Sequence, residues 1–253
     1  MALIRTPNET EIKIAAVKFK CDASLGNHIP SPLAKGNQAL FFVGGAGSGK
    51  TTVLTNLISG PYKKVFDKIW LFCPSNSLLS LEKKHPFLKY IEETADVKHS
   101  GIVGYVFNEL SAELLQICIN ESRADAAEGK NTLIIADDQL HMLRGDKRIE
   151  TLLKEILANR RHYHMSLFCL VQLWISGVPK CIRLQASAIF LWKPTKREYK
   201  DIREELFVEF TDPEINVIAK ECWREPHDFL YLTQNNLGNA VYDKNFSRLS
   251  FNE

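Results

Sequence analysis

A glycine-rich segment at residues 44–51 constrains the fold of this chain more than any other feature. It reads Gly-Gly-Ala-Gly-Ser-Gly-Lys-Thr and matches the pattern G-x-x-x-x-G-K-[ST] at every defined position. An apolar run at residues 39–43 precedes it, and a helical pattern at residues 50–58 follows and ends at the Ser-Gly-Pro sequence 59–61. A strand, a glycine loop and a helix in this order predict the ATP-binding loop (Walker A motif) of a P-loop NTPase.

The residue types in this loop suit the binding of a phosphate chain. Glycines let consecutive backbone N–H groups turn toward an anion, and the start of a helix adds partial positive charge. We expect Lys50 to reach the β- and γ-phosphates of ATP and the Thr51 hydroxyl to bind Mg²⁺. The residues expected to bind the nucleotide are Gly44, Gly45, Ala46, Gly47, Ser48, Gly49, Lys50, Thr51 and Thr52. The alternative is a glycine-rich turn that contains Lys-Thr by chance.

Two neighbouring carboxylates follow a second apolar run. Residues 133–136 predict a buried strand, and Asp137 and Asp138 come directly after it (Walker B motif). Asp137 is expected to hold Mg²⁺, and Asp138 is the candidate general base that activates the attacking water. A second carboxylate favours water as the phosphate acceptor over a simple kinase arrangement. Taken alone, such a run can equally be a strand that ends in a polar turn.

Strand and helix patterns alternate along the rest of the chain. Further strands are expected at residues 68–73, 167–171 and 188–192, and helices near residues 87–93, 108–123, 147–160 and 195–206 and after the Asp-Pro pair 212–213. Residues 229–233 and 240–242, around Gly238, predict a C-terminal β-hairpin. This alternation is typical of a three-layer α/β/α fold whose mostly parallel central sheet is covered on both faces.

Composition predicts a globular protein without a membrane span. The chain is 45% hydrophobic and 25% charged with a net charge of +2, so DNA contacts would come from local clusters or from a channel between subunits. The longest apolar stretch, residues 166–178, is too short to span a bilayer. We expect one domain at residues 38–253, after a leader at residues 1–37 that contains a strand at residues 11–20.

The motifs after the acidic pair follow a particular order. An Arg-Arg-His sequence at residues 160–162 leads into the strand pattern 167–171, which ends at Gln172. This order resembles that of the poxvirus-type genome-packaging ATPases of large DNA viruses and virophages, which belong to the FtsK–HerA superfamily of DNA-pumping motors. The resemblance covers roughly residues 30–242.

The resemblance implies a ring-shaped homo-oligomer, a pentamer or a hexamer, that moves double-stranded DNA into a preformed capsid and docks on capsid or vertex proteins. It implies an additional strand between the Walker A and Walker B strands, with Gln172 at its tip as a sensor of the γ-phosphate. It also implies a place in the host cytoplasm or viral factory during virion assembly, with possible retention in the virion. Without the resemblance, Gln172 would be read as a strand-end glutamine bonded to backbone.

Three arginines are candidates for reaching the γ-phosphate of a neighbouring subunit. Arg161 leads because it precedes His162 as in the family, followed by Arg160 and Arg183. The alternative for Arg160 and Arg161 is that they cap the C-terminal end of the preceding helix. The wider superfamily often has Glu where this chain has Asp138, which changes the geometry for positioning water.

Two other functions are compatible with a phosphate loop. A small P-loop kinase, such as a nucleoside kinase, would transfer phosphate to a small acceptor and would not respond to DNA. An ATP-dependent assembly switch would hydrolyse ATP slowly and without stimulation by DNA. Neither accounts for the arrangement of Asp138, Arg161 and Gln172.

Overall fold

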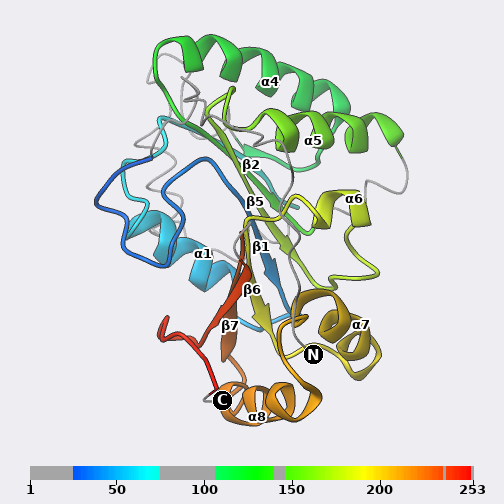
Figure 1. Ribbon diagram of the computed structural model, residues 1–253. Coiled ribbons are helices and arrows are strands. Elements are labelled where there is room, and N and C mark those ends of the chain that lie inside the picture. Colours follow the sequence, from blue (N-terminus) through cyan, green and yellow to red (C-terminus); the bar gives the residue numbers. More distant parts are fainter. Residues whose placement is uncertain (1–24, 75–105, 140–145, 236–237, 252–253) are drawn as a thin grey trace, which may run out of the picture.

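The structure of the protein is a computed structural model (Figure 1). It describes residues 25–74, 106–139, 146–235 and 238–251. The strand expected at residues 11–20 and the helix expected near residues 87–93 lie outside the described residues. Among the helices that the structure describes, none is both long enough and apolar enough to cross a membrane.

A single mixed sheet forms the centre of the described part of the chain. Its strands are β1 (Ala39–Val43), β2 (Lys68–Phe72), β3 (Val106–Phe107), β4 (Thr132–Asp137), β5 (Met165–Val171), β6 (Ala188–Trp192), β7 (Phe229–Asn235) and β8 (Gly238–Tyr242). They lie in the order β3-β2-β4-β5-β1-β6-β7-β8. The pairs from β3 to β6 are parallel, and β7 pairs antiparallel with both β6 and β8. The mostly parallel sheet and the C-terminal hairpin are therefore confirmed.

Strand β5 lies between β1, which leads into the phosphate loop, and β4, which ends in the acidic pair. Leu167 of β5 is level with Ala39 of β1 and with Ile134 of β4. All seven residues of β5 are buried, as expected for a central parallel strand covered on both faces. The additional strand expected between the two nucleotide-binding strands is confirmed, and it brings Gln172 to the same edge of the sheet as Asp138.

Helices cover both faces of the sheet. They are α1 (Lys50–Ser59), α4 (Ala112–Ala127), α5 (Lys147–Asn159), α6 (Lys180–Arg183), α7 (Lys196–Leu206) and α8 (Asp212–Cys222). Successive strand residues point to opposite faces, so Phe41 packs in the apolar cluster of α4 to α8 and Phe42 in that of α1. Figure 1 shows α1 on one side of the sheet and α4, α5 and α6 on the other. This is the predicted three-layer α/β/α fold.

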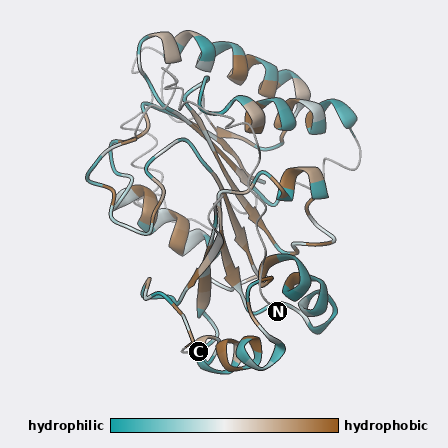
Figure 2. Cartoon of the chain, viewed as in Figure 1, coloured by the Kyte–Doolittle hydropathy of each residue, from teal (hydrophilic) through white to brown (hydrophobic). Residues whose placement is uncertain are grey.

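Burial follows the apolar patterns of the sequence. In Figure 2 the central strands are mostly brown, whereas α7 is mostly teal. The amphipathic α7 buries Ile202 and Leu206 and leaves most of its charged residues at the surface. Leu25, Ile29 and Leu33, from the end of the expected leader, are buried in the same cluster as α1. This part of the leader therefore packs as part of the domain.

The boundaries of several elements differ from the expected ones. Helix α4 begins at Ala112 and not at residue 108, because the Ser111 hydroxyl accepts a hydrogen bond from the N–H of Leu114 and caps the helix. Leu110 is buried outside the helix, and its N–H donates to Gln139 Oε1 at 2.9 Å. The short strand β3 and the four-residue helix α6 were not predicted, since both are too short to show a period.

Candidate nucleotide-binding and hydrolysis site

The phosphate loop joins the end of β1 to the start of α1, as predicted. Gly47 (φ 72°) and Gly49 (φ 102°) have left-handed backbone conformations, which glycine adopts without strain. Gly49 is the N-cap of α1, and no described side chain caps the N–H groups of its first turn. These N–H groups, together with the partial positive charge of the helix N-terminus, have the geometry and charge that suit an anion.

Gly44 is required for a different reason, which is close packing. A Cβ atom at this position would lie 2.8 Å from Ser48 Oγ and 2.8 Å from Trp192 Cβ. Trp192 is the last residue of β6, which pairs with β1 on the side away from β5. The end of β6 therefore packs against Gly44, the first residue of the loop.

Lys50 reaches back over the loop that precedes it. Its Nζ donates to the carbonyl oxygens of Gly44 at 2.6 Å and Gly45 at 2.9 Å. Burial lowers the pKa of Lys50, and the nearby carboxylates of Asp138 and Asp137 oppose this shift. The ammonium group thus lies between the phosphate loop and the acidic pair.

The acidic pair lies at the carboxyl end of β4. Asp137 is level with Leu170 of β5, and the N–H of Asp138 donates to Leu170 O at 3.1 Å. Asp138 has a φ of 51°, a left-handed conformation that aspartate tolerates better than most residues. Burial, followed by the charge of Asp138, raises the pKa of Asp137, whereas the Cys73 thiol (3.6 Å from Asp137 Oδ2) and Lys50 lower it.

Gln172 contacts the candidate base directly. Its Nε2 donates to Asp138 Oδ2 at 2.9 Å. This hydrogen bond joins the first residues after β5 and β4, which lie on neighbouring strands at one edge of the sheet. The partner of the Gln172 amide is thus a carboxylate of the site, whereas the alternative interpretation assigned it to backbone.

The arginines that precede β5 lie at the opposite edge of the sheet. The N–H of Met165, the first residue of β5, donates to Arg160 O at 2.8 Å. The seven residues of β5 then separate this edge from Gln172 by roughly 20 Å, at about 3.3 Å per residue. Arg160 and Arg161 therefore lie far from the nucleotide site of their own chain.

The environments of these two arginines differ. The Arg160 guanidinium donates to Leu157 O in the last turn of α5 at 2.5 Å, and burial lowers its pKa. This contact is the helix-capping alternative considered for it. Arg161 follows at the exposed surface beyond the end of α5. Of the pair, Arg161 is the one that is exposed at the surface of the chain.

Arg183 is part of the interior of its own chain, which argues against it as an arginine that acts in a neighbouring subunit. Its Nε and Nη2 donate to the two oxygens of Glu205, both at 2.8 Å, and its Nη1 donates to the carbonyls of Ile175 and Val178. Its side chain is only 9% exposed. A guanidinium fixed in this way cannot extend to a neighbouring subunit.

Two residues near the site were missed by sequence reasoning. The buried Glu198 of α7 accepts hydrogen bonds from the N–H groups of Trp174 and Ser176, and so shapes the segment after Gln172. His227 lies beside the phosphate loop, with Nδ1 3.2 Å from Ser48 O. No local pattern marks either residue, because each acts on a segment far away in the sequence.

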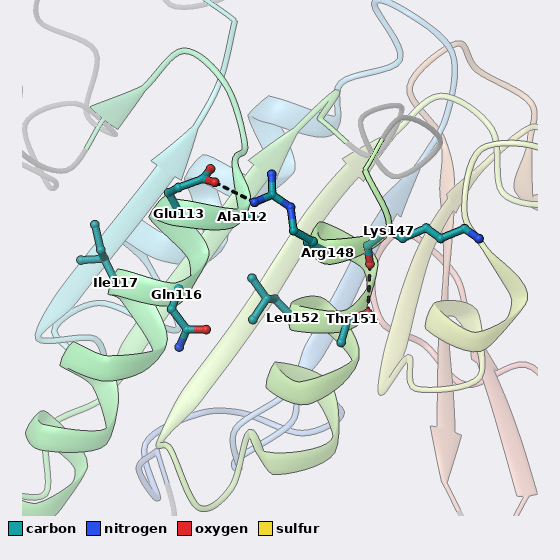
Figure 3. A pocket seen from close by; sticks show the side chains of 8 residues that line it. All are labelled: Ala112, Glu113, Gln116, Ile117, Lys147, Arg148, Thr151 and Leu152. Atoms are coloured by element: carbon teal, nitrogen blue, oxygen red, sulfur yellow. Dashed lines mark hydrogen bonds and ion pairs between the residues drawn. The ribbon is translucent and has the colours of Figure 1, made fainter.

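A cavity of about 670 Å³ lies elsewhere, between α4 and α5 (Figure 3). Its lining residues are Ala112, Glu113, Gln116, Ile117, Lys147, Arg148, Thr151 and Leu152. Glu113 and Arg148 form an ion pair at 3.0 Å, and in Figure 3 the side chain of Lys147 points away from this pair. None of the predicted nucleotide-binding or catalytic residues lines this cavity.

Solved structures with a similar fold include viral packaging proteins. The DNA-packaging ATPase B204 from Sulfolobus turreted icosahedral virus aligns with a TM-score of 0.59 and 14% identity, over 81% of this chain and 97% of that chain. B204 from Sulfolobus turreted icosahedral virus 2, in complex with AMP, gives 0.54 and 16%, over 81% and 96%. The pCW3 conjugation coupling protein TcpA gives 0.56 and 13%, over 84% and 61%. At these identities the similarity shows a shared fold.

Sequence comparison identifies the family. No curated protein is significantly similar to this chain in sequence. The family model described as Poxvirus A32 protein matches residues 30–190, which is more than half of the 253 residues. The matched segment contains the phosphate loop, the acidic pair, the Arg-Arg-His sequence and Gln172. The chain therefore belongs to the poxvirus A32 protein family, which confirms the resemblance inferred from the order of its motifs.

Proposed function

We propose that this protein is an ATP-hydrolysing motor that translocates double-stranded viral DNA into a preformed capsid. The observation that carries this proposal is the 2.9 Å hydrogen bond between Gln172 and Asp138, which joins the strand between the two nucleotide-binding strands to the candidate base. Membership of the A32 family and the fold shared with the B204 packaging ATPases support the same function.

ATP is the proposed nucleotide, and residues 44–52 would hold its phosphates. The similar structures of B204 from Sulfolobus turreted icosahedral virus 2 include complexes with AMP, AMPPCP and ATP-gammaS. In this chain Lys50 already lies over the loop, bonded to the Gly44 and Gly45 carbonyls, so a phosphate would replace these carbonyls as its partner.

The oxygen ligands beside the loop suit Mg²⁺. A hydroxyl and a carboxylate are the ligands this cation prefers, and Thr51 and Asp137 would supply them. The raised pKa of Asp137, caused first by burial and then by Asp138, is consistent with a carboxylate that a cation would stabilise in its charged form. When bound, Mg²⁺ would neutralise charge on the phosphate oxygens.

Asp138 would accept the proton of the attacking water, and Gln172 would hold its carboxylate in place. The amide of Gln172 is the group that would sense the γ-phosphate, because it contacts Asp138 from the strand between β1 and β4. Lys50 would stabilise the charge that develops on the γ-phosphate.

Arg161 would act in a neighbouring subunit of a ring, a pentamer or a hexamer. Its position at the edge of the sheet opposite Gln172 places it out of reach of its own site, while its exposure leaves it accessible to a second copy. Such a ring would surround DNA and dock on capsid or vertex proteins. Because the protein would act during virion assembly, it would be located in the host cytoplasm or viral factory.

The test is steady-state ATP hydrolysis with and without long double-stranded DNA. We expect DNA to stimulate the wild-type protein and Asp138→Asn to lower kcat by roughly 100-fold or more with ATP binding retained. Lys50→Ala should abolish ATP binding. Transfer of phosphate to a nucleoside, with no response to DNA, would instead establish a small kinase, and slow hydrolysis indifferent to DNA would establish an assembly switch.

A further inference from the structure

His227 makes a specific contact with the phosphate loop from a distant part of the chain. Its Nδ1 lies 3.2 Å from the carbonyl oxygen of Ser48, 179 residues away in the sequence. A carbonyl oxygen only accepts hydrogen bonds, so Nδ1 is the ring nitrogen that carries the proton. The same Nδ1 lies 3.6 Å from the position that a Cβ atom at Gly49 would occupy. The imidazole thus covers the loop just before Lys50.

The segment that carries His227 is held in a defined conformation. The buried carboxylate of Asp228 accepts hydrogen bonds from the N–H groups of Arg224 at 3.1 Å and Glu225 at 2.8 Å. Lys244, which follows β8, forms an ion pair with the same carboxylate. These contacts fix the turn between α8 and β7 from both sides.

The end of β6 attaches this turn to the sheet. Trp192 Nε1 donates to His227 O at 3.2 Å, and Trp223 Nε1 donates to Leu191 O at 3.2 Å. Trp192 is also level with Phe229, the first residue of β7. Trp192 also packs against Gly44, so the same tryptophan contacts both the turn and the phosphate loop.

The phosphate loop has a physical need for such a contact. Ser48 lies between Gly47 and Gly49, both in left-handed conformations, and glycines have the widest choice of backbone conformations. A hydrogen bond to the Ser48 carbonyl favours one orientation of the peptide between Ser48 and Gly49. A loop that is ordered before the ligand arrives loses less entropy on binding.

We propose that His227 is a positioning residue of the nucleotide site, which donates its Nδ1 proton to Ser48 O and holds the phosphate loop in its binding conformation. The ligand whose binding it supports is the phosphate chain of a nucleotide. The contact also links the nucleotide site to the C-terminal hairpin through the turn before β7. This inference rests on the proposed function of the loop as an ATP site.

The experiment compares His227→Ala, His227→Asn and His227→Gln by their affinity for a fluorescent ATP analogue and for inorganic tripolyphosphate. His227→Ala should weaken both affinities about fivefold, the equivalent of about 1 kcal/mol for one hydrogen bond, and should raise KM for ATP while kcat stays within about twofold. Asparagine places its amide N–H near the position of Nδ1, so His227→Asn should restore affinity to within about twofold. Glutamine places its amide N–H near the other ring nitrogen, Nε2, so His227→Gln should restore less of the affinity.

Glu225→Ala is the matched control, because Glu225 is exposed on the same turn and its side chain is not part of the hydrogen bond between His227 and Ser48. It should bind ATP as the wild type does. Wild-type affinity in His227→Ala, or an asparagine variant as weak as the alanine variant, would overturn the inference. Lys50→Ala separates the two proposals: if it too binds ATP normally, the proposed ATP site itself fails, whereas its loss of binding leaves only the role of His227 in question.

Discussion

The amide of Gln172 donates a hydrogen bond of 2.9 Å to the carboxylate of Asp138, across the junction of β5 and β4. The two residues are 34 positions apart in the sequence and meet because β5 inserts next to β4. A neutral donor at this place orients the carboxylate without adding charge to the site. The candidate base and the candidate sensor are therefore one hydrogen-bonded unit.

Removing the amide should impair hydrolysis more than binding. In Gln172→Ala we expect kcat to fall about tenfold, the value of one hydrogen bond to a charged group, with ATP affinity within about twofold of wild type. Gln172→Glu should be slower still, since it places a like charge beside Asp138. The neighbouring exposed residue provides a control, Leu173→Ala, which should hydrolyse ATP normally. Single-turnover hydrolysis and equilibrium binding measure the two effects, and normal hydrolysis by Gln172→Ala would contradict this role.

Two adjacent glycines of the phosphate loop should differ in their tolerance of a side chain. Gly44→Ala places a Cβ 2.8 Å from both Ser48 Oγ and Trp192 Cβ, so the free energy of unfolding should fall by about 1–3 kcal/mol. At Gly45 a Cβ would meet no atom within 4 Å, so Gly45→Ala should unfold like the wild type in the absence of nucleotide. Thermal or urea unfolding of both variants measures this difference in the free energy of unfolding. Equal stabilities would mean that Trp192 does not support the loop.

Arg161 should complement a defective site in another subunit. Arg161→Ala alone should lower kcat by roughly 10³-fold, the effect of losing a charge that stabilises the transition state. Mixed with Asp138→Asn subunits it should regain part of the activity, because some interfaces then combine an intact Asp138 with an intact Arg161. The control is a mixture of Arg160→Ala with Asp138→Asn. Arg160 caps its own helix, so Arg160→Ala should lower the stability of the fold and should not remove a catalytic group. Mixtures that assemble but stay inactive would rule out action between subunits.

Arg183 should matter for stability and not for catalysis. Its bidentate pair with Glu205 is largely buried, so Arg183→Met leaves a carboxylate without its cation and should cost about 3–5 kcal/mol of unfolding free energy. The exposed pair of Lys200 and Glu204, at 3.9 Å, provides the comparison, and Lys200→Met should cost less than about 1 kcal/mol. Denaturant unfolding measures both changes. If Arg183→Met unfolds like wild type but hydrolyses ATP poorly, Arg183 belongs to the active site after all.

Much of this protein can be predicted from the sequence because the signals are local. The phosphate loop, the strand before it and the acidic pair are each contained in a few consecutive residues, and their backbone conformations follow from glycine, apolar and carboxylate side chains at fixed spacing. Helix α5 and strand β6 were likewise expected close to their observed bounds, since residues on one face of an element repeat at its own period. The order of these motifs was enough to predict the family.

Tertiary structure alone decided which side chains meet. Arg161 and Arg183 are both arginines near the ends of helices, yet one is exposed and the other is bound to Glu205 in the interior. The position of His227 beside Ser48 depends on the antiparallel return of β7 along β6, which no local pattern records. Contacts between residues far apart in the chain depend on strand order and register. These are set by the packing of the whole core, whereas the left-handed conformations of the phosphate loop are open to Gly47 and Gly49 because both are glycines.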